Sequence, residues 1–307
     1  MNRRASVVSR KAVGRSVDKV LRRRTRKAPK LGAEVKPQIR AMTDPSMVVD
    51  MLKSSPGTMH FREGEYLHVS DLVGKCMRKI ALSIRTGVSM PSEPLFDSLG
   101  ITFAQGNAIH EYVRDRAAIV SSEYLYGNWH CLCKTEQFMG THRESRKKPK
   151  CEKCGTGLDT YDELVVKNED VKVTGAVDMP FLINDYFYLS EIKSISKGQW
   201  DVLNRAKPDH VIQVLMYWWL MKEAGYKLYD QISVLYAVKE YVFKNPYKEF
   251  VITPSEHIHR LEDYLQEARE LKVSREGGDL PKRTSCPKEN CPTAKKCNLS
   301  TVCFTME

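Results

Sequence analysis

Two apolar segments joined by a short polar turn constrain the fold of this chain more than any other feature. Residues 171–183 and 186–194 are apolar, and Asn184-Asp185 between them is typical of a tight β-hairpin turn. The first segment carries Asp178 and the second carries Glu191-Ile-Lys193. Because side chains alternate along a strand, the glutamate and the lysine share one face. The sequence therefore predicts a hairpin that bears two carboxylates and a lysine.

This set of charged side chains is typical of metal-dependent phosphodiester hydrolysis. Two carboxylates can hold a hard divalent cation through oxygen ligands. Such a cation polarises a phosphoryl oxygen and generates hydroxide near neutral pH. Lys193 would then point at the phosphate and the attacking water. A charged edge strand without chemistry is the alternative that this motif alone leaves open.

The other expected elements indicate an α/β fold with a mixed sheet. Helix signals cover residues 96–121, 208–224, 255–272, a short stretch over 44–53, and 71–85 with Ser70 as its N-cap. Further strands are expected over residues 163–166, 231–238 and 248–253. Their order predicts a mixed central sheet flanked by helices, within one domain from about residue 46 to 303.

Positive charge is concentrated at the N-terminal end. Residues 1–41 contain fourteen Lys or Arg against two acids, Asp18 and Glu34, whereas the whole chain has 49 basic and 38 acidic residues. A basic arm over residues 1–45 is typically disordered when free. It suits a polyanion such as DNA, because neutralised phosphates release counterions. A solvated tail without a specific role is the alternative.

Three residues on the expected helices suit the same chemistry. Gln213 and Tyr217 are four apart on the helix that follows the hairpin, so they share one helical face. They could hold the substrate phosphate or position Lys193, or they could simply line an amphipathic helix. His110 would add a nitrogen ligand beside the carboxylates, and imidazole favours manganese over magnesium.

Together these motifs resemble those of the PD-(D/E)XK nuclease superfamily. The series is Cys76, Gly106-x-x-x-His110, Glu163, Gly175-x-x-Asp178, Glu191-x-Lys193, Gln213-x-x-x-Tyr217 and a C-terminal cysteine cluster. Within the superfamily the chain is similar to the RecB-like branch, which includes AddB-type nuclease domains and the CRISPR-associated RecB-like exonucleases. The resemblance covers about residues 65–303 and implies a restriction-endonuclease-like fold. Val177 stands where the wider family pattern has Pro.

The resemblance implies a role for each matched residue. The implied ligands of Mg²⁺ or Mn²⁺ are His110, Asp178, Glu191 and the backbone carbonyl of Ile192. Lys193 would orient or activate the attacking water and stabilise the developing charge. Gln213 and Tyr217 would support the lysine and the DNA strand, and Glu163 would be a supporting acidic residue.

The nine cysteines are clustered, which indicates metal binding rather than disulfides in a chain without a secretory signal. Four of them lie in residues 129–157, a segment that is not a usual part of the RecB-like branch. The pairs Cys131-x-Cys133 and Cys151-x-x-Cys154 predict a structural zinc ribbon, in which His130 could replace one thiolate. Reduced cysteines in a mobile loop are the alternative. The basic stretch over residues 142–150 could contact DNA phosphates.

The resemblance also implies a [4Fe–4S] cluster that joins the two ends of the nuclease domain. In the RecB-like branch, one cysteine upstream of the histidine motif and three near the C-terminus hold it. Cys76 matches the first of these, and Cys297 and Cys303 match the end of the pattern. The remaining ligand is Cys291 or, as the alternative, Cys286. A zinc site formed by the four C-terminal cysteines alone is the rival interpretation, since thiolates suit both.

These expectations combine into a metal-dependent DNA exonuclease that acts on single-stranded DNA or DNA ends in recombination, repair or replication. A flap-type endonuclease of the same chemistry and a non-catalytic nucleic-acid-binding protein are the alternatives. A recombination or replication protein is a candidate partner. No apolar run reaches the length of a membrane span, and the basic N-terminus lacks an apolar signal core. We therefore expect a cytoplasmic protein of a bacterium or a phage-infected cell, without a membrane partner.

Overall fold

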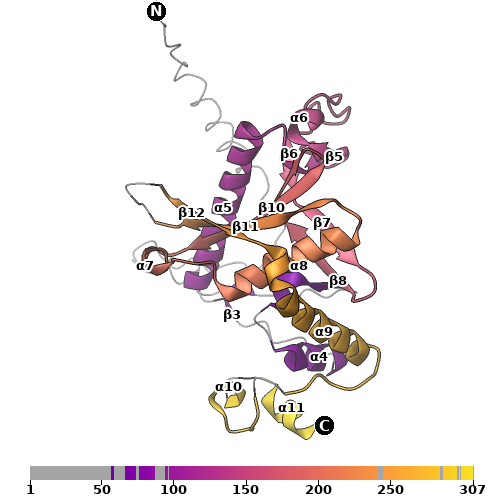
Figure 1. The fold of residues 1–307 in the computed structure, drawn as a ribbon, viewed down its shortest axis with the longest axis vertical. Coiled ribbons are helices and arrows are strands. Elements are labelled where there is room, and N and C mark those ends of the chain that lie inside the picture. The colour runs from indigo at the N-terminus through magenta and orange to yellow at the C-terminus, as the bar shows by residue number, and fades with distance from the viewer. Residues whose placement is uncertain are drawn as a thin grey trace, which may run out of the picture. The chain divides into compact units, whose positions relative to one another are not determined.

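The computed structural model describes residues 57–58, 66–73, 76–86, 94–95, 97–240, 242, 245–283, 286–295, 297 and 299–306. The chain divides into two units, residues 1–54 and 55–307, and all described residues belong to the second. The basic arm and the expected helix over residues 44–53 lie outside the described residues. Within the second unit, helices flank mixed sheets (Figure 1), which confirms the expected α/β class.

The largest sheet has four strands in the order β12-β11-β10-β9. Its strands are β9 (Met179–Ile183), β10 (Tyr186–Ile195), β11 (Leu228–Val238) and β12 (Tyr247–Ile252). β10 and β11 are parallel, and the other two pairs are antiparallel. Asn184 and Asp185, at φ of 49° and 66°, make the turn between β9 and β10. Two consecutive positive φ angles match the twist of a hairpin, and the predicted hairpin is confirmed.

The segment expected as one strand over residues 171–183 forms two strands in two different sheets. β8 (Val173–Val177) lies between β2 (Leu67–His68), to which it is parallel, and β7 (Leu164–Asn168), to which it is antiparallel. At Asp178 the chain leaves this sheet and enters the four-stranded sheet as β9. Both halves are apolar, so the sequence reads as one strand. Asp178 therefore lies at a corner between two sheets.

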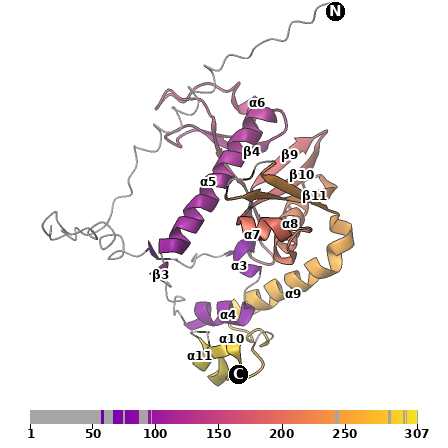
Figure 2. The ribbon, with the colours of Figure 1, turned by 90° about the vertical axis from the view of Figure 1, so that its left-hand side faces the viewer.

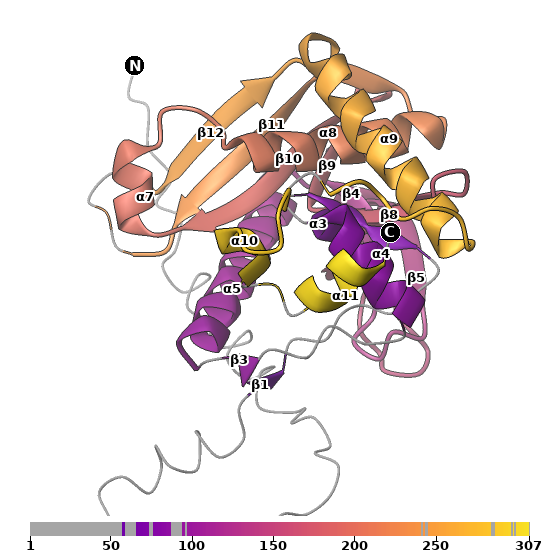
Figure 3. The same ribbon diagram turned by 90° about the horizontal axis from the view of Figure 1, so that it is seen from below.

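Two long helices pack on opposite faces of β10 (Figure 3). They are α8 (Pro208–Glu223) and α5 (Asp97–Val120), close to their expected ranges. Leu189 of β10 is buried in an apolar cluster to which α8 contributes. Ile192, on the other face of the strand, is buried in a second cluster with Val113 of α5. No described helix is long and apolar enough to cross a membrane.

The helix expected over residues 71–85 is interrupted. The structure has a short helix, α3 (Val69–Leu72), followed by α4 (Met77–Thr86). Ser70 lies inside α3, and the N-cap is His68 at the end of β2, so the predicted cap is wrong. The interruption allows α3 to pack against β8 and α8, while α4 packs against α9 (Ile258–Arg275).

The ends of the described unit meet at α4. Two short helices near the C-terminal end are α10 (Pro292–Lys295) and α11 (Ser300–Thr305). Elsewhere in the unit, β1 (Gly57–Thr58) pairs with β3 (Pro94–Leu95), and the other short helices are α7 (Lys197–Val202) and the 3-10 helix η2 (Pro254–His257). α10 and α11 lie beside α4 (Figure 2), and α11 contacts it. Segments from the two ends of the unit therefore form one face around Cys76.

A separate antiparallel sheet lies between α5 and β7 in the sequence. β4 (Tyr126–His130) pairs with both β5 (Gln137–Thr141) and β6 (Thr160–Asp162), and the short helix α6 (His142–Ser145) follows β5. This sheet frames the cysteine pairs that were expected in a zinc ribbon over residues 129–157. We call residues 126–162 the cysteine insert.

Candidate functional site

Asp178 is buried at the corner between β8 and β9, with 6% of its surface exposed. Its Oδ2 accepts a hydrogen bond from the backbone N–H of Ile192 at 2.8 Å. The bond is available because β9 pairs with β10 only as far as Met179 opposite Ser190. The N–H and C=O of one strand residue point to the same side, so the Ile192 carbonyl also faces Asp178. The corner thus holds the carboxylate against the Glu-Ile-Lys motif.

Glu191, Lys193, Gln213 and Tyr217 form a continuous chain of hydrogen bonds. Lys193 Nζ donates to Glu191 Oε1 at 2.8 Å and to Gln213 Oε1 at 2.9 Å. Gln213 Nε2 donates to Glu191 Oε1 and to the Tyr217 hydroxyl, both at 2.9 Å. The structure therefore brings together the four residues that the sequence singled out on the strand and on the following helix.

Gly175 leaves the space that the ring of Tyr217 occupies. A Cβ atom at position 175 would lie 2.4 Å from Tyr217 Cε1 and 2.7 Å from its Cδ1. Tyr217 is 5% exposed and packs in the main core, so its ring has little room to move away. The glycine of the Gly-x-x-Asp motif is therefore a packing requirement of β8 beneath α8.

Burial shifts the protonation of the acidic groups in this site. Burial and the charge of Asp178 raise the pKa of Glu191 to about 8, against the opposing effect of Lys193. Burial acts to raise the pKa of Asp178 as well, but the net pKa is lowered because His110 favours the carboxylate. Burial also raises the pKa of Tyr217 well above its usual value. A cation that replaces the Glu191 proton would relieve the repulsion between the two carboxylates.

His110 reaches the site from α5. Its Nδ1 lies 3.6 Å from Asp178 Oδ1. Gly106, one turn earlier, allows the helix to approach β10, because a Cβ there would lie 3.1 Å from Ser194 Oγ. His110, Asp178 and Glu191 do not each place a ligand atom within 4.8 Å of the others, whereas Cys131, Cys133, Cys151 and Cys154, also among the described residues, do. The three possible metal ligands are therefore neighbours, but their ligand atoms are not all close enough to surround one ion.

Two side chains that the sequence analysis did not single out also contact this site. Arg114, one turn after His110 on α5, forms an ion pair with Glu163. Burial, followed by the charge of Asp178, raises the pKa of Glu163. The Arg114 guanidinium lies 5.9 Å from the ring centroid of Tyr161 in β6. Arg114 lies four residues after His110, so the helical repeat could have indicated that both side chains share one face of α5. No local spacing in the sequence indicates that Tyr161 lies near the site.

The four cysteines of the insert lie close together. Cys133 Sγ is 3.4 Å from Cys131 Sγ and 3.7 Å from Cys151 Sγ. These three sulfurs and that of Cys154 all lie within 4.8 Å of one another. Thiolates about 2.3 Å from a tetrahedral zinc would be about 3.8 Å apart. Hydrogen bonding by Thr156 lowers the pKa of Cys154 to about 5 and favours its thiolate. These four cysteines could therefore hold a metal ion.

His130 faces oxygen atoms rather than this set of sulfurs. Its Nδ1 lies 2.9 Å from the Cys131 carbonyl oxygen, and its Nε2 lies 3.0 Å from Asp162 Oδ2. The basic stretch over residues 142–150 is largely exposed. Within it, Arg143 forms an ion pair with Glu123 at 3.1 Å. The stretch over residues 142–150 therefore presents mainly positive side chains.

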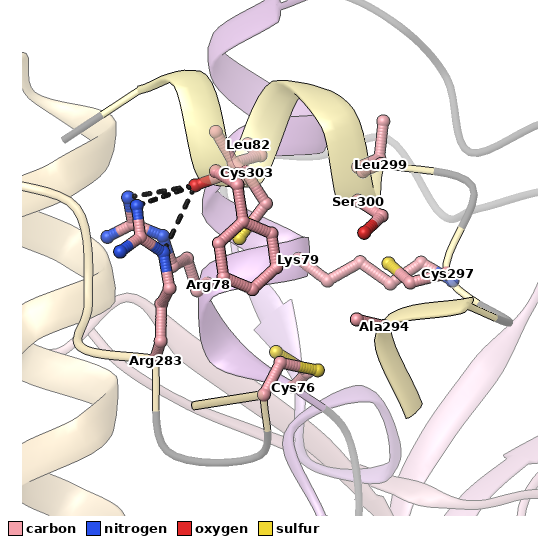
Figure 4. Close-up of a pocket in the computed structure, with 12 residues that line it drawn as sticks. Cys76, Arg78, Lys79, Leu82, Arg283, Ala294, Cys297, Leu299, Ser300 and Cys303 are labelled. Carbon is pink, nitrogen blue, oxygen red and sulfur yellow. Dashed lines mark hydrogen bonds between the residues drawn. The ribbon is translucent and has the colours of Figure 1, made fainter. Parts of the chain in front are cut away.

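Cys76 and three C-terminal cysteines, Cys286, Cys297 and Cys303, line one pocket (Figure 4). Burial, followed by the neighbouring thiol of Cys291, raises the pKa of Cys286 to about 11. Within the described part of the chain, these sulfurs do not gather within 4.8 Å as those of the insert do.

Two arginines hold the C-terminal segment over this pocket. Arg78 Nη1 donates to the Pro281 carbonyl at 3.0 Å. Arg283 Nη2 donates to the Cys303 carbonyl at 2.9 Å (Figure 4). Arg78 Nη2 also donates to the carbonyl of Met306. Arg78 Nε is buried and has no hydrogen-bond partner among the described atoms. Arg78 lines the same pocket as the cysteines, and an anionic group bound there would give this donor an acceptor.

No protein-family model matches the chain, and no curated protein matches it. Matches exist among solved structures. One of them, described as the crystal structure of SSO0001, is 13% identical in sequence, and the match covers 67% of this chain and 78% of that one, with a TM-score of 0.31. A likeness this low supports no conclusion about fold or function.

Proposed function

We propose that this chain is a metal-dependent deoxyribonuclease of the PD-(D/E)XK type with a restriction-endonuclease-like, RecB-like core. The observation that carries the proposal is the buried chain of hydrogen bonds from Lys193 to Glu191 and Gln213, next to the fixed carboxylate of Asp178. Burying charged groups costs free energy, which pairing offsets only in part. A hairpin with only a structural role does not require a lysine and two carboxylates at this position.

The donor set suits a hard divalent cation. Asp178, Glu191 and the Ile192 carbonyl offer oxygen ligands, which Mg²⁺ and Mn²⁺ prefer, and His110 offers a nitrogen that favours Mn²⁺. When bound, the cation would polarise a phosphoryl oxygen and lower the pKa of a water molecule. Burial, followed by the charge of Asp178, raises the pKa of Glu191, and this supports a cation here because the ion would replace the proton.

Lys193 is the residue best placed to act on the reacting groups. Its ammonium is held between Glu191 and Gln213, and 19% of the side chain remains exposed. From this position it would stabilise the negative charge that develops on the phosphate and orient the attacking water. Gln213 keeps the ammonium in place, and Tyr217 in turn orients the amide of Gln213.

Two further cofactors belong to the proposal. We assign zinc to Cys131, Cys133, Cys151 and Cys154 because their sulfurs have the spacing of a tetrahedral site. We assign a [4Fe–4S] cluster to Cys76, Cys297 and Cys303, with Cys291 or Cys286 as the fourth ligand. The lining of the pocket favours Cys286. Such a cluster would tie α4 to the C-terminal helices.

DNA is the proposed substrate, as single strands or free ends, with a role in recombination, repair or replication. The exposed basic stretch over residues 142–150 supports this substrate class, because phosphates are bound by Lys and Arg whatever the base sequence. Exonuclease action is the proposed mode because the resemblance of the motifs is to RecB-like exonucleases.

The test is a nuclease assay on protein purified without oxygen. Linear single- and double-stranded DNA labelled at the 5′ or the 3′ end, and circular single-stranded DNA, are incubated with Mn²⁺, Mg²⁺ or chelator. We expect cation-dependent loss of label from linear DNA by the wild type, no loss by Lys193→Ala, and full activity of Lys222→Ala. Lys222 is the matched control because it lies at the far end of α8, where its Nζ packs over the Trp218 ring.

Three other outcomes of this assay would contradict part of the proposal. Cleavage of the circular strand would identify an endonuclease of the same chemistry. Equal activity of Lys193→Ala and wild type would overturn the assigned site. Tight DNA binding without cleavage under any condition would favour a non-catalytic nucleic-acid-binding protein.

A further inference from the structure

The cysteine insert reaches the corner that carries Asp178. The hydroxyl of Tyr161, in β6 of the insert, donates a hydrogen bond to the backbone carbonyl of Asp178 at 3.0 Å. The carboxylate of the same residue accepts the Ile192 N–H at 2.8 Å. Asp178 is therefore held from two sides, by the insert through its backbone and by β10 through its side chain.

Packing inside the insert fixes the ring of Tyr161. It lies opposite Trp129 in the pairing of β4 with β6, and the ring centroids are 4.9 Å apart in an edge-to-face arrangement. A Cβ atom at position 127 would lie 2.2 Å from Tyr161 Cε2, so Gly127 leaves room for the ring. Trp129 is itself anchored by Nε1, which donates to the Gly140 carbonyl at 2.9 Å. The hydroxyl of Tyr161 is thus carried on a rigid pair of strands.

The four cysteines lie in the segment that connects these same two strands. Cys131 directly follows β4, and the Cys151–Cys154 pair precedes β6. Cys131 and Cys151 are buried in one apolar cluster with Met179 and Ile192. Met179 follows Asp178 in the chain, and Ile192 lies between Glu191 and Lys193. The cysteine site and the catalytic motif therefore share one packed core.

We propose that the metal-bound insert positions the catalytic carboxylate, with Tyr161 as the positioning residue that connects the two. This inference rests on the proposed nuclease function. An ion held by four thiolates would close the loop between β4 and β6 and fix their pairing. Tyr161 then holds the backbone of Asp178 where the chain passes between sheets. Without the ion or the hydroxyl, the backbone of Asp178 loses its restraint from the insert, so the catalytic cation binds less tightly.

The first test compares two tyrosine variants that each lose one hydroxyl. Tyr161→Phe removes the hydroxyl that lies 3.0 Å from the Asp178 carbonyl and 3.3 Å from the Tyr126 carbonyl. Tyr229→Phe removes the bond from Tyr229 to the Ile183 carbonyl, at the other end of β9, at 3.1 Å. Mn²⁺ binding to DNA-free full-length protein is measured by calorimetry, and the component lost in Asp178→Asn defines the catalytic site. Zinc content and melting temperature are recorded for every variant.

We expect Tyr161→Phe to weaken Mn²⁺ binding by about fivefold, the equivalent of one ordinary hydrogen bond. Its kcat should fall while its KM for DNA and its zinc content stay unchanged. Tyr229→Phe should bind Mn²⁺ like the wild type. A merely structural role would lower the melting temperature of both variants and leave Mn²⁺ binding alone.

A second arm removes the ion instead of the hydroxyl. Cys154→Ser should weaken Mn²⁺ binding to a similar extent, and adding Tyr161→Phe should weaken it little further, because both changes act through one link. Equal Mn²⁺ affinity of Tyr161→Phe and Tyr229→Phe would overturn the inference, as would unchanged Mn²⁺ affinity in zinc-free Cys154→Ser. Loss of Mn²⁺ affinity in Tyr161→Phe with no DNA cleavage by the wild type would overturn the nuclease proposal and leave the positioning role standing. Absence of Mn²⁺ binding by the wild type would overturn both.

Discussion

Gln213 Oε1 accepts a hydrogen bond from Lys193 Nζ at 2.9 Å, and the other end of the amide fixes this orientation. Gln213 Nε2 donates to Glu191 Oε1 and to the Tyr217 hydroxyl. A flipped amide would place a donor against the ammonium and an acceptor against the carboxylate. Glutamine is suited to the position because its amide both accepts and donates without carrying charge.

Gln213→Glu should therefore lower kcat by about tenfold or more, because Glu191 loses its donor and gains a second negative neighbour. The KM for DNA should change little, since the amide touches protein groups only. Gln199→Glu is the matched control, because Gln199 also accepts from a lysine, Lys207 Nζ at 3.1 Å, but on the exposed surface. Steady-state kinetics with Mn²⁺ decide the matter, and equal kcat values for the two variants would show that the amide donor is dispensable.

Gly175→Ala should destabilise the protein by about 1–3 kcal/mol, the usual range for overpacking a core. The added methyl would press on the buried ring of Tyr217 and, through it, on Gln213, so activity should fall as well. Gly198→Ala in α7 is the control. Its Cβ would meet nothing within 4 Å, and alanine is favoured in helices. Urea unfolding measures both variants, and equal midpoints would contradict the packing argument.

The two groups of cysteines should lose different metals. Cys154→Ser should remove zinc and leave iron unchanged, whereas Cys297→Ser should remove iron and leave zinc unchanged. Elemental analysis and the visible absorption of protein purified without oxygen provide the readout. The same measurement on Cys286→Ser and Cys291→Ser separates the fourth cluster ligand from the spare cysteine, and we expect the larger iron loss from Cys286→Ser because Cys286 lines the pocket. Iron absent from the wild type would remove the cluster assignment.

His210 should make the stability of the fold depend on pH. Burial, with help from Lys193 and Lys207, lowers its pKa to about 4. The Tyr236 hydroxyl accepts from the Lys207 N–H at 2.9 Å and lies 2.8 Å from His210 Nδ1. The folded state therefore keeps this imidazole neutral, whereas the unfolded chain protonates it below about pH 6.5. Stability should be fully present above that pH and fall as the pH drops towards 4.

The measurement for this prediction is the urea midpoint at several pH values between 4 and 7. His210→Gln should flatten the decline, because it removes the group that must stay neutral. His259→Gln, at an exposed position on α9, should leave the slope of the wild type unchanged. An unchanged slope in His210→Gln would mean that other groups govern the acid response.

The parts of the site that were predictable from sequence depend on local spacing. Glu191 and Lys193 share a strand face by alternation, and Gln213 and Tyr217 share a helix face by the four-residue repeat. The turn at Asn184-Asp185 was equally local, since both residues tolerate positive φ. These motifs meet as the spacing predicted, through the parallel pairing of β10 with β11 and the packing of α8 above them.

The parts that were not predictable depend on contacts between distant segments. The corner at Asp178 occurs within one apolar run, because the change of sheet is decided by the partners β7 and β10 and not by the run itself. The break after α3 reflects two different packing partners, α8 for α3 and α9 for α4. Tyr161 carries no motif and reaches Asp178 only because the sheet of the insert folds against the corner.

The hydrogen bonds from Arg78 to the carbonyls of Pro281, Cys303 and Met306 bear on the order in which parts of the chain fold during translation. These acceptors are more than 200 residues farther along the chain, so the central sheet can form on the ribosome before they have been synthesised. Closing so long a loop is slow compared with local folding. The pocket around Cys76 is therefore the last part to assemble, and any metal bound there would enter a core that has already folded.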